Sequence, residues 1–180
     1  MTDPRIRRAT AADAAALARV YRSAYRENRE LGFPAKAESA TEREVAEWIV
    51  ECRVYVATVE EAARDDAADD DAAGDATGDD AAGEGAIVGG VRLAETDPDR
   101  VKLSRLGVHG DWKGEGVGSS LVAHAERAAR ADGYEAIWLT TPGEHPYLPG
   151  FYRRRGYEET GTYPLEYREY DEIVMEKRLG

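Results

Sequence analysis

One stretch, residues 101–131, constrains the fold of this chain more than any other. It begins with an apolar-rich run, Val101–Val108, and passes through a polar turn into three alternate glycines, which are Gly114, Gly116 and Gly118. From Val117 onward apolar residues recur at the spacing of one helix face, until Asp132–Gly133 signals a stop. The pattern predicts a strand, a glycine loop and a helix in direct succession.

Such a loop is suited to binding an anion. Glycine permits backbone conformations and close approaches that a Cβ would block, and the first turn of a helix presents N–H groups without internal partners. The helix dipole adds a partial positive charge, and Lys113 adds a full charge just before the first glycine. A phosphate or pyrophosphate is the simplest ligand.

Spacing discriminates among the known phosphate-binding loops. The P-loop string G-x-x-x-x-G-K-[ST] is absent from the chain. The dinucleotide fingerprint G-x-G-x-x-G would begin at Gly114, but it meets Ser119 at its third glycine and lacks an acidic residue about 20 positions later. Residues 113–118, KGEGVG, instead resemble the acyl-CoA loop [Q/R]-x-x-G-x-[G/A] of the GNAT superfamily of N-acyltransferases, with Lys113 in place of Gln or Arg.

A second segment strengthens this resemblance. Residues 151–157, FYRRRGY, are similar to the superfamily's later signature, an aromatic-Tyr pair followed three residues on by Gly and an aromatic residue. The segment follows a strand predicted at Ala136–Thr141. The resemblance implies an α+β fold, in which about four helices flank a mixed, mostly antiparallel sheet of roughly six to seven strands.

The resemblance also implies a site for acetyl-CoA, which would bind as a co-substrate without a metal. In GNAT proteins the strand before the loop bulges and splays from the next one, so that its backbone binds pantetheine. A glycine inside a strand often marks a bulge or a close backbone approach, and Gly107 holds such a position. The residues assigned to the co-substrate are Leu106, Gly107, Val108, Lys113, Gly114, Glu115, Gly116, Val117, Gly118 and Ser119.

Acylation of an amine requires a neutral amine, stabilisation of an oxyanion and a proton for the departing thiolate. Direct transfer in a ternary complex needs no protein nucleophile. Tyr152 is the candidate general acid, because a phenol with a pKa of about 10 can protonate a thiolate of comparable basicity. Its alternative role is a packed aromatic residue with its hydroxyl on the co-substrate. A main-chain N–H near Val108 would meet the oxyanion.

The general base stays open among Glu95, Glu144, His145 and a water chain. Some GNAT enzymes carry a carboxylate on the central strand, where this chain has Lys102. By the same resemblance, Asn28 and Phe33 are candidate contacts of the acceptor.

The remaining elements follow from local patterns. A capping box at Thr41–Glu44 opens a helix, and β-branched residues predict a strand at Val54–Val59. The further predictions are a strand at Arg5–Ala9, a helix from Thr10 or Asp13 to Arg29, a loop at Glu30–Ala40, a strand at Ala86–Ala94, a turn at Thr96–Asp99, a helix at Leu148–Arg154, and strands at Tyr157–Tyr163 and Tyr170–Arg178.

Residues 60–85 differ from the rest of the chain. They contain no aromatic residue and no Leu, Ile or Val, and therefore cannot bury enough apolar surface to offset the entropy of ordering. We predict a solvated, mobile extension of a hairpin within a single domain of residues 1–180. The calcium-loop pattern D-x-[DN]-x-[DN]-G is absent there.

Charge narrows the classes of function. The net charge of −12 argues against general nucleic-acid binding, since phosphate backbones select basic surfaces. Excess Asp and Glu together with scarce Lys predict a halophilic protein, adapted to a high-salt cytoplasm where screening shortens the reach of self-repulsion. The acidic composition also weakly favours a cationic acceptor.

Other features indicate a cytoplasmic location. Cys52 is the single cysteine, so no intrachain disulfide can form. The N-terminus lacks the apolar core of a signal peptide, and no apolar run approaches the roughly 18 residues of a membrane span. The expected function is acetyl transfer from acetyl-CoA to a primary amine of a small molecule or protein. The alternative is an acetyl-CoA-binding sensor or interaction module without turnover, and the family resemblance makes a homodimer plausible.

Overall fold

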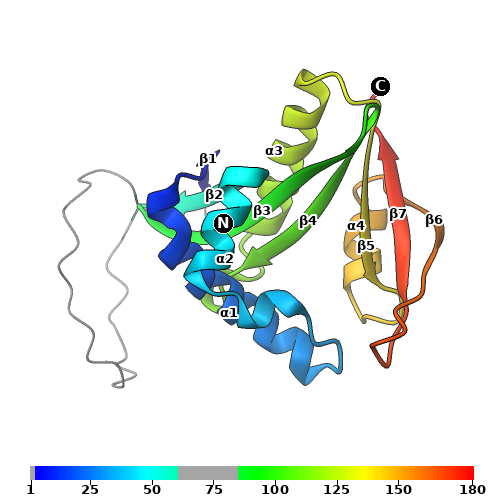
Figure 1. Cartoon of the computed structure of the whole chain (residues 1–180), viewed down its shortest axis with the longest axis horizontal. Coiled ribbons are helices and arrows are strands. Elements are labelled where there is room, and N and C mark those ends of the chain that lie inside the picture. The colour runs from blue at the N-terminus through cyan, green and yellow to red at the C-terminus, as the bar shows by residue number, and fades with distance from the viewer. Residues whose placement is uncertain (1–2, 61–84) are drawn as a thin grey trace.

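The computed structural model describes residues 3–60 and 85–180, which form seven strands and four α-helices around one sheet (Figure 1). In chain order the elements are β1 (Arg5–Arg8), α1 (Ala14–Glu30), α2 (Glu42–Glu51), β2 (Arg53–Val59), β3 (Ala86–Asp97), β4 (Arg100–Val108), α3 (Val117–Ala131), β5 (Ala136–Pro142), α4 (Leu148–Arg153), β6 (Glu158–Tyr163) and β7 (Glu172–Arg178).

The sheet is mixed, and its strand order is β1-β2-β3-β4-β5-β7-β6. Every neighbouring pair is antiparallel except β4 and β5. Those two strands pair only where Arg100–Lys102 meets Ala136–Trp138. Beyond these three rungs the strands diverge, and Figure 1 shows β5, β7 and β6 standing apart from β1–β4 at the other end of the sheet.

Helices cover both faces of the N-terminal half of the sheet. Successive side chains of its strands point to opposite faces, and apolar side chains lie on both. In β2, Val54 and Val56 pack with α1 and α2 in one apolar cluster. Tyr55 and Ala57 point the other way and join the cluster beneath α3. This period of two is the expected geometry of a strand buried on both faces.

The sequence suggested a bulge at Gly107 of β4, and the structure has the bulge immediately before this residue. Gly107 pairs with Gly90 and Ser104 pairs with Arg92, so the two residues Arg105 and Leu106 face a single residue of β3. Arg105 takes up the extra length in a left-handed conformation with φ +53°. Gly107 itself serves a close approach, because a Cβ there would lie 3.0 Å from Tyr21 Cδ1.

The expected fold class is confirmed, and the predicted elements differ from the observed ones mainly at their ends. The predicted loop at Glu30–Ala40 contains a 3-10 turn at Lys36–Ser39, and β3 continues to Asp97, so that only Pro98 and Asp99 form the turn. The hairpin extension predicted at residues 60–85 lies, apart from its two end residues, outside the described residues. On either side of it, Val59 pairs with Ala86 in antiparallel register.

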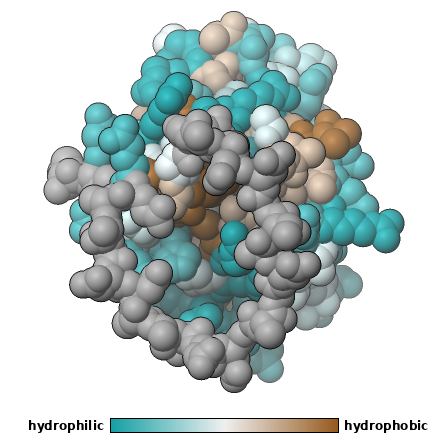
Figure 2. Space-filling model, turned by 90° about the vertical axis from the view of Figure 1, so that its left-hand side faces the viewer, coloured by the Kyte–Doolittle hydropathy of each residue, from teal (hydrophilic) through white to brown (hydrophobic). Residues whose placement is uncertain are grey.

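The visible surface agrees with the charged composition. Figure 2 shows hydrophilic residues over most of the described surface on that face, with apolar residues gathered in a few patches. Within the described ranges, no helix is long and apolar enough to cross a membrane.

Candidate active site

One large cavity, of about 1250 Å³, opens where β4 and β5 diverge. Its walls come from the end of α1, the α1–α2 connection, β3, β4, the glycine loop, β5, α4 and the β6–β7 connection. Tyr152 lines this cavity, as do all the residues that the sequence assigned to a co-substrate except Glu115. Residues far apart in the sequence therefore meet at one site.

The glycine loop presents a run of free main-chain donors. The first bond of α3 runs from the N–H of Ser120 to the carbonyl of Gly116, at 3.0 Å. No hydrogen bond from the amides of residues 114–119 is found within the described part of the chain. Gly114 and Gly116 adopt φ of +82° and +86°, a conformation that only glycine reaches without strain. The amides of Gly116–Ser119 thus open the positive end of the helix and those of residues 114 and 115 come just before it, an arrangement suited to an anion.

The end of β4 directs further backbone groups into the cavity. The N–H of His109 donates to the carbonyl of Val88 at 2.8 Å, so the adjacent pair of Val108 and Gly89 is a non-hydrogen-bonded one. The N–H and C=O of Val108 therefore point away from β3, into the space between β4 and β5. The carbonyl of Leu106 accepts a hydrogen bond from the hydroxyl of Tyr25 at 2.8 Å, and a carbonyl oxygen has two lone pairs and can accept a second bond.

Tyr152 lies on α4 with its side chain buried. Its ring meets Phe151 and Tyr157 edge-on, with centroids 5.1 and 5.5 Å away. Burial raises the pKa of Tyr152, and the neighbouring Tyr25 adds to the effect. The phenol is consequently protonated throughout the neutral range, so it can donate a hydrogen bond or a proton.

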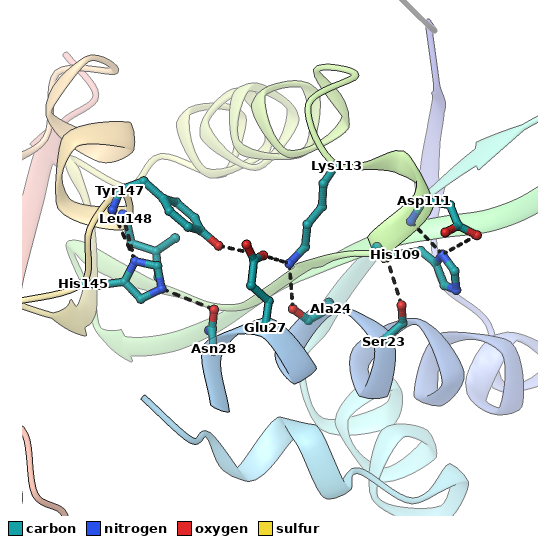
Figure 3. Close-up of polar contacts among 11 residues, drawn as sticks. Ser23, Ala24, Glu27, Asn28, His109, Asp111, Lys113, His145, Tyr147 and Leu148 are labelled. Atoms are coloured by element: carbon teal, nitrogen blue, oxygen red, sulfur yellow. Dashed lines mark hydrogen bonds and ion pairs between the residues drawn. The ribbon is translucent and has the colours of Figure 1, made fainter. Parts of the chain in front are cut away.

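The ammonium of Lys113 lies against α1 and does not face the loop amides (Figure 3). Its Nζ donates to the carbonyl of Ala24 at 3.1 Å and to Oε2 of Glu27. The hydroxyl of Tyr147 donates to the same carboxylate oxygen at 3.0 Å. The hydrogen bond from Lys113 is the main reason why the pKa of Glu27 is lowered. The free cation expected over the glycine loop is therefore neutralised by a carboxylate that the sequence pattern did not indicate.

None of the three side chains considered as a general base lines the cavity. Glu95 is exposed and borders a separate depression near α2 and the end of α3. Glu144 is exposed and lies outside the cavity wall. His145 is buried, but it too lies outside the wall.

His145 has a bonding pattern that suits a structural role. Its Nδ1 accepts hydrogen bonds from the amides of Tyr147 and Leu148, at 3.4 and 3.3 Å. The proton must then reside on Nε2, which donates to Oδ1 of Asn28 at 3.3 Å (Figure 3). Burial lowers the pKa of His145, in agreement with a neutral ring. The ring ties the end of α1 to the β5–α4 connection, and both nitrogens are engaged.

The match to known proteins agrees with this geometry. The model of the acetyltransferase (GNAT) family matches residues 42–157, which include the bulged strand, the glycine loop and Tyr152. The chain belongs to the GNAT acetyltransferase family. Proteins of this family use acetyl-CoA to acetylate amines.

Solved structures of other acetyltransferases share the fold of this GNAT chain. The ribosomal-protein-S18-alanine N-acetyltransferase from Escherichia coli superposes with a TM-score of 0.70 at 16% identity, covering 99% of this chain and 95% of its own. The PaiA N-acetyltransferase from Thermoplasma acidophilum, in complex with coenzyme A, has a TM-score of 0.70 at 17% identity and coverages of 98% and 99%. The ribosomal-protein-alanine N-acetyltransferase from Brucella melitensis has a TM-score of 0.69 at 20% identity and coverages of 97% and 99%.

The cavity of this GNAT acetyltransferase has the donors and acceptors that coenzyme A requires. The free amides of residues 114–119 suit its pyrophosphate, and the backbone of Val108 suits the amide groups of its pantetheine arm. Thr141 adds a buried Oγ1 that has no partner among the described residues and lines the same space. Arg155 also lines the cavity, and it holds the start of α3 through a hydrogen bond to Ser119 Oγ.

Several cavity residues of this acetyltransferase escaped the sequence analysis. Glu27 and Glu172 are the two carboxylates on the described wall, and Glu172 has no ion pair there. Neither belongs to a local motif, because each reaches the cavity only through the packing of distant elements. The candidate acceptor contacts Asn28 and Phe33 do line the cavity, where the Phe33 ring lies 5.2 Å from that of His145.

Proposed function

We propose that this protein transfers the acetyl group of acetyl-CoA to a primary amine directly, within a ternary complex. The observation that carries the proposal is that the glycine loop (Gly114 and residues 116–119), the cavity-facing backbone of Val108 and Tyr152 all border one cavity. An activated acetyl thioester is the chemistry that acetyl-CoA supplies. The residues of this chain bind and orient the two substrates and move the protons.

Three groups are assigned to the chemistry. The N–H of Val108 stabilises negative charge that develops on the carbonyl oxygen. Tyr152 hydrogen-bonds and protonates the departing thiolate; burial raises its pKa, so the phenol carries its proton at neutral pH until negative charge develops on the sulfur. Glu172 accepts the proton of the acceptor ammonium, directly or through water, because it is a cavity carboxylate that forms no ion pair with a described cation.

Ligand-induced stabilisation tests the proposal first. A ligand at about 100 times its Kd adds roughly 2.7 kcal/mol to the free energy of unfolding. Acetyl-CoA should therefore raise the melting temperature in a saturable way, and adenosine diphosphate should do so less. Release of the CoA thiol with a panel of primary amines then measures transfer. Binding without thiol release for any amine would indicate a sensor, and absence of both would refute the assignment.

We also propose that the protein is adapted to high salt. Excess carboxylates repel one another, and screening by salt reduces that repulsion. Thermal unfolding should shift to higher temperature as potassium chloride rises into the molar range. Full stability in dilute buffer would contradict this part of the proposal.

A further inference from the structure

Three cations share one wall of the cavity. Arg92 comes from β3, Lys102 from β4 and Arg105 from the bulge of β4. The strand alternation sends Arg92 to the same face as its partner Val54, which packs beneath α1 and α2. The cations therefore occupy the α1 and α2 side of the sheet, whereas the glycine loop leads into α3 on the other side.

Glu172 is near enough to oppose the lowering of the Lys102 pKa by burial, but no described carboxylate pairs directly with the cluster. Among the described residues, none of the three cations forms an ion pair. In a chain with a net charge of −12, where carboxylates are abundant, such an arrangement is unexpected for a purely structural cluster. Its lining position leaves the charges open to a ligand.

Aromatic rings hold the cations but leave their donors available. The guanidinium carbons of Arg92 and Arg105 lie 5.4 and 5.0 Å from the ring centre of Trp48, and Lys102 Nζ lies 4.7 Å from that of Trp138. Stacking on a ring face stabilises the positive charge of the side chain, but it gives no hydrogen-bond acceptor to the N–H groups of the cation. Nε of Arg92 donates to Ser104 Oγ at 3.0 Å, whereas the buried Nε of Arg105 has no partner among the described residues.

The cluster is costly without an anion. Burial lowers the pKa of Arg92, and the charge of Arg105 lowers it further. Burial likewise lowers the pKa of Lys102, while Glu172 opposes that effect. Positive charges that are close together and partly desolvated destabilise the empty cavity, and a bound oxyanion would relieve this cost.

We propose that the acceptor is a small amine that also carries an oxyanion, as a free amino acid does, with the oxyanion held by Arg92, Lys102 and Arg105. This inference rests on the proposed function and names its acceptor class. Glu172, close enough to influence Lys102, receives the ammonium end of the same molecule. The cavity thus offers one carboxylate for the amine and three cations for the oxyanion. We therefore propose an acceptor that carries both charges in place of the cationic acceptor that the acidic composition favoured.

Matched pairs of acceptors test the proposal by kinetics. Each pair consists of an amino acid and its decarboxylated amine, such as leucine with 3-methylbutylamine and phenylalanine with phenethylamine. At constant ionic strength we expect kcat/KM to be at least about tenfold higher for the amino acid, since a hydrogen-bonded charge is worth at least that factor. An equal or higher value for the amines would overturn the proposal.

Variants then connect the preference to the cluster. Arg105→Gln and Lys102→Gln should each lower the ratio of kcat/KM for the amino acid to that for its amine about tenfold, while the affinity for acetyl-CoA is unaltered. Arg43→Gln is the matched control, because Arg43 is exposed on α2, pairs with Glu47 at 3.2 Å and lies outside the cavity. Equal losses for both acceptors, or the same loss in the control, would overturn the assignment.

A binding measurement separates this inference from the proposed function. Calorimetry in the presence of CoA compares N-acetyl-leucine with its uncharged amide and needs no turnover. Tighter binding of the acid, lost in Arg105→Gln, supports the oxyanion site even if no amine is acetylated. If thiol is released with uncharged amines while acid and amide bind equally, the transferase function stands and the oxyanion site is refuted.

Discussion

The two halves of the cavity are built in different ways. The half at the start of α3 is made of main-chain groups, namely the amides of residues 114–119 and the backbone of Val108. The other half is made of side chains, among them Arg105 from β4, Glu172 from β7 and Phe33 from the α1–α2 connection. Main-chain groups can bind any molecule of the right shape, whereas side chains carry the specificity. We therefore propose that one half serves a shared co-substrate and the other an acceptor particular to this protein.

The largest expected effect lies where the two halves meet. Tyr152→Phe removes the proposed proton donor and should lower kcat about 100-fold, the lower end of the range for acid–base catalysis, without changing the affinity for acetyl-CoA. Single-turnover measurement of thiol release, together with calorimetry, checks both statements. Tyr157→Phe is the control, because Tyr157 is buried next to Tyr152 but does not line the cavity. Unchanged turnover in Tyr152→Phe would leave Tyr152 as a packed aromatic residue.

A substitution in the acceptor half should lower activity with the amine and leave the binding of acetyl-CoA unchanged. Glu172→Gln should lower kcat/KM for the amine roughly 30-fold at neutral pH, because a water chain replaces a general base only in part, and the affinity for acetyl-CoA should not change. The loss should shrink at high pH, where more of the amine is already neutral. Glu169→Gln serves as a control, since Glu169 is exposed and outside the cavity wall. A pH profile that is unchanged in Glu172→Gln would exclude Glu172 as the base.

A side chain added at Gly107, in the floor of the cavity, should lower the free energy of unfolding. A Cβ at Gly107 would lie 3.0 Å from Tyr21 Cδ1 and 3.1 Å from Ala24 Cβ, so α1 would have to move away from β4. Gly107→Ala should cost about 1.5 kcal/mol of unfolding free energy, a typical value for overpacking. Urea titration measures this cost. Gly161→Ala, where no atom lies within 4 Å, should cost far less, and equal costs would mean that α1 adjusts freely.

The main-chain half can be weakened without touching the acceptor half. Gly116 and Gly133 both have strongly positive φ, of +86° and +87°, and both are clear of neighbouring atoms. Alanine at either position should therefore cost about 1 kcal/mol through strain. Only Gly116→Ala should also lower the affinity for acetyl-CoA, by about tenfold, because Gly116 lines the cavity and Gly133 does not. An equal effect of both substitutions on affinity would show that the loop amides do not bind the ligand.

The smallest effect concerns a site outside both halves. The carboxylate of Asp13 accepts hydrogen bonds from Arg7 Nη1 and Nη2 at 2.8 and 2.9 Å, and the bond with Arg7 is the main cause that lowers the pKa of Asp13. A lowered pKa stabilises the fold above the unfolded value of about 3.9, and this stability is lost as pH falls through the folded pKa. Asp13→Asn should therefore cost about 1 kcal/mol at pH 7 and progressively less below about pH 4. Urea titrations at both pH values measure it, and altered affinity for either substrate would contradict its separation from the cavity.

The contrast between the halves also explains what the sequence could predict. The glycine spacing, the capping box and the β-branched run of β2 are local patterns, so the helices, the strands and the loop could be predicted from neighbouring residues, whereas the fold class and the role of Tyr152 rested on the resemblance of two short motifs to the GNAT superfamily. The ion pair of Lys113 with Glu27 joins residues from the glycine loop and α1, and the cavity position of Glu172 depends on β7 pairing beside β5. No local sequence pattern predicts such contacts between residues that are far apart in the chain. Glu95, Glu144 and His145 were chosen by residue type, and packing turns all three away from the cavity.

The three rungs that join β4 to β5 have one last consequence. The protein folds without finishing its own hydrogen-bond ladder, and it keeps the vacant edges of two strands facing each other. A substrate arm that carries amide groups can lie between those edges like an additional strand. Recognition of that kind uses backbone groups and does not depend on particular side chains. Mutations could therefore change the acceptor pocket while the same small molecule continued to bind between the two strand edges.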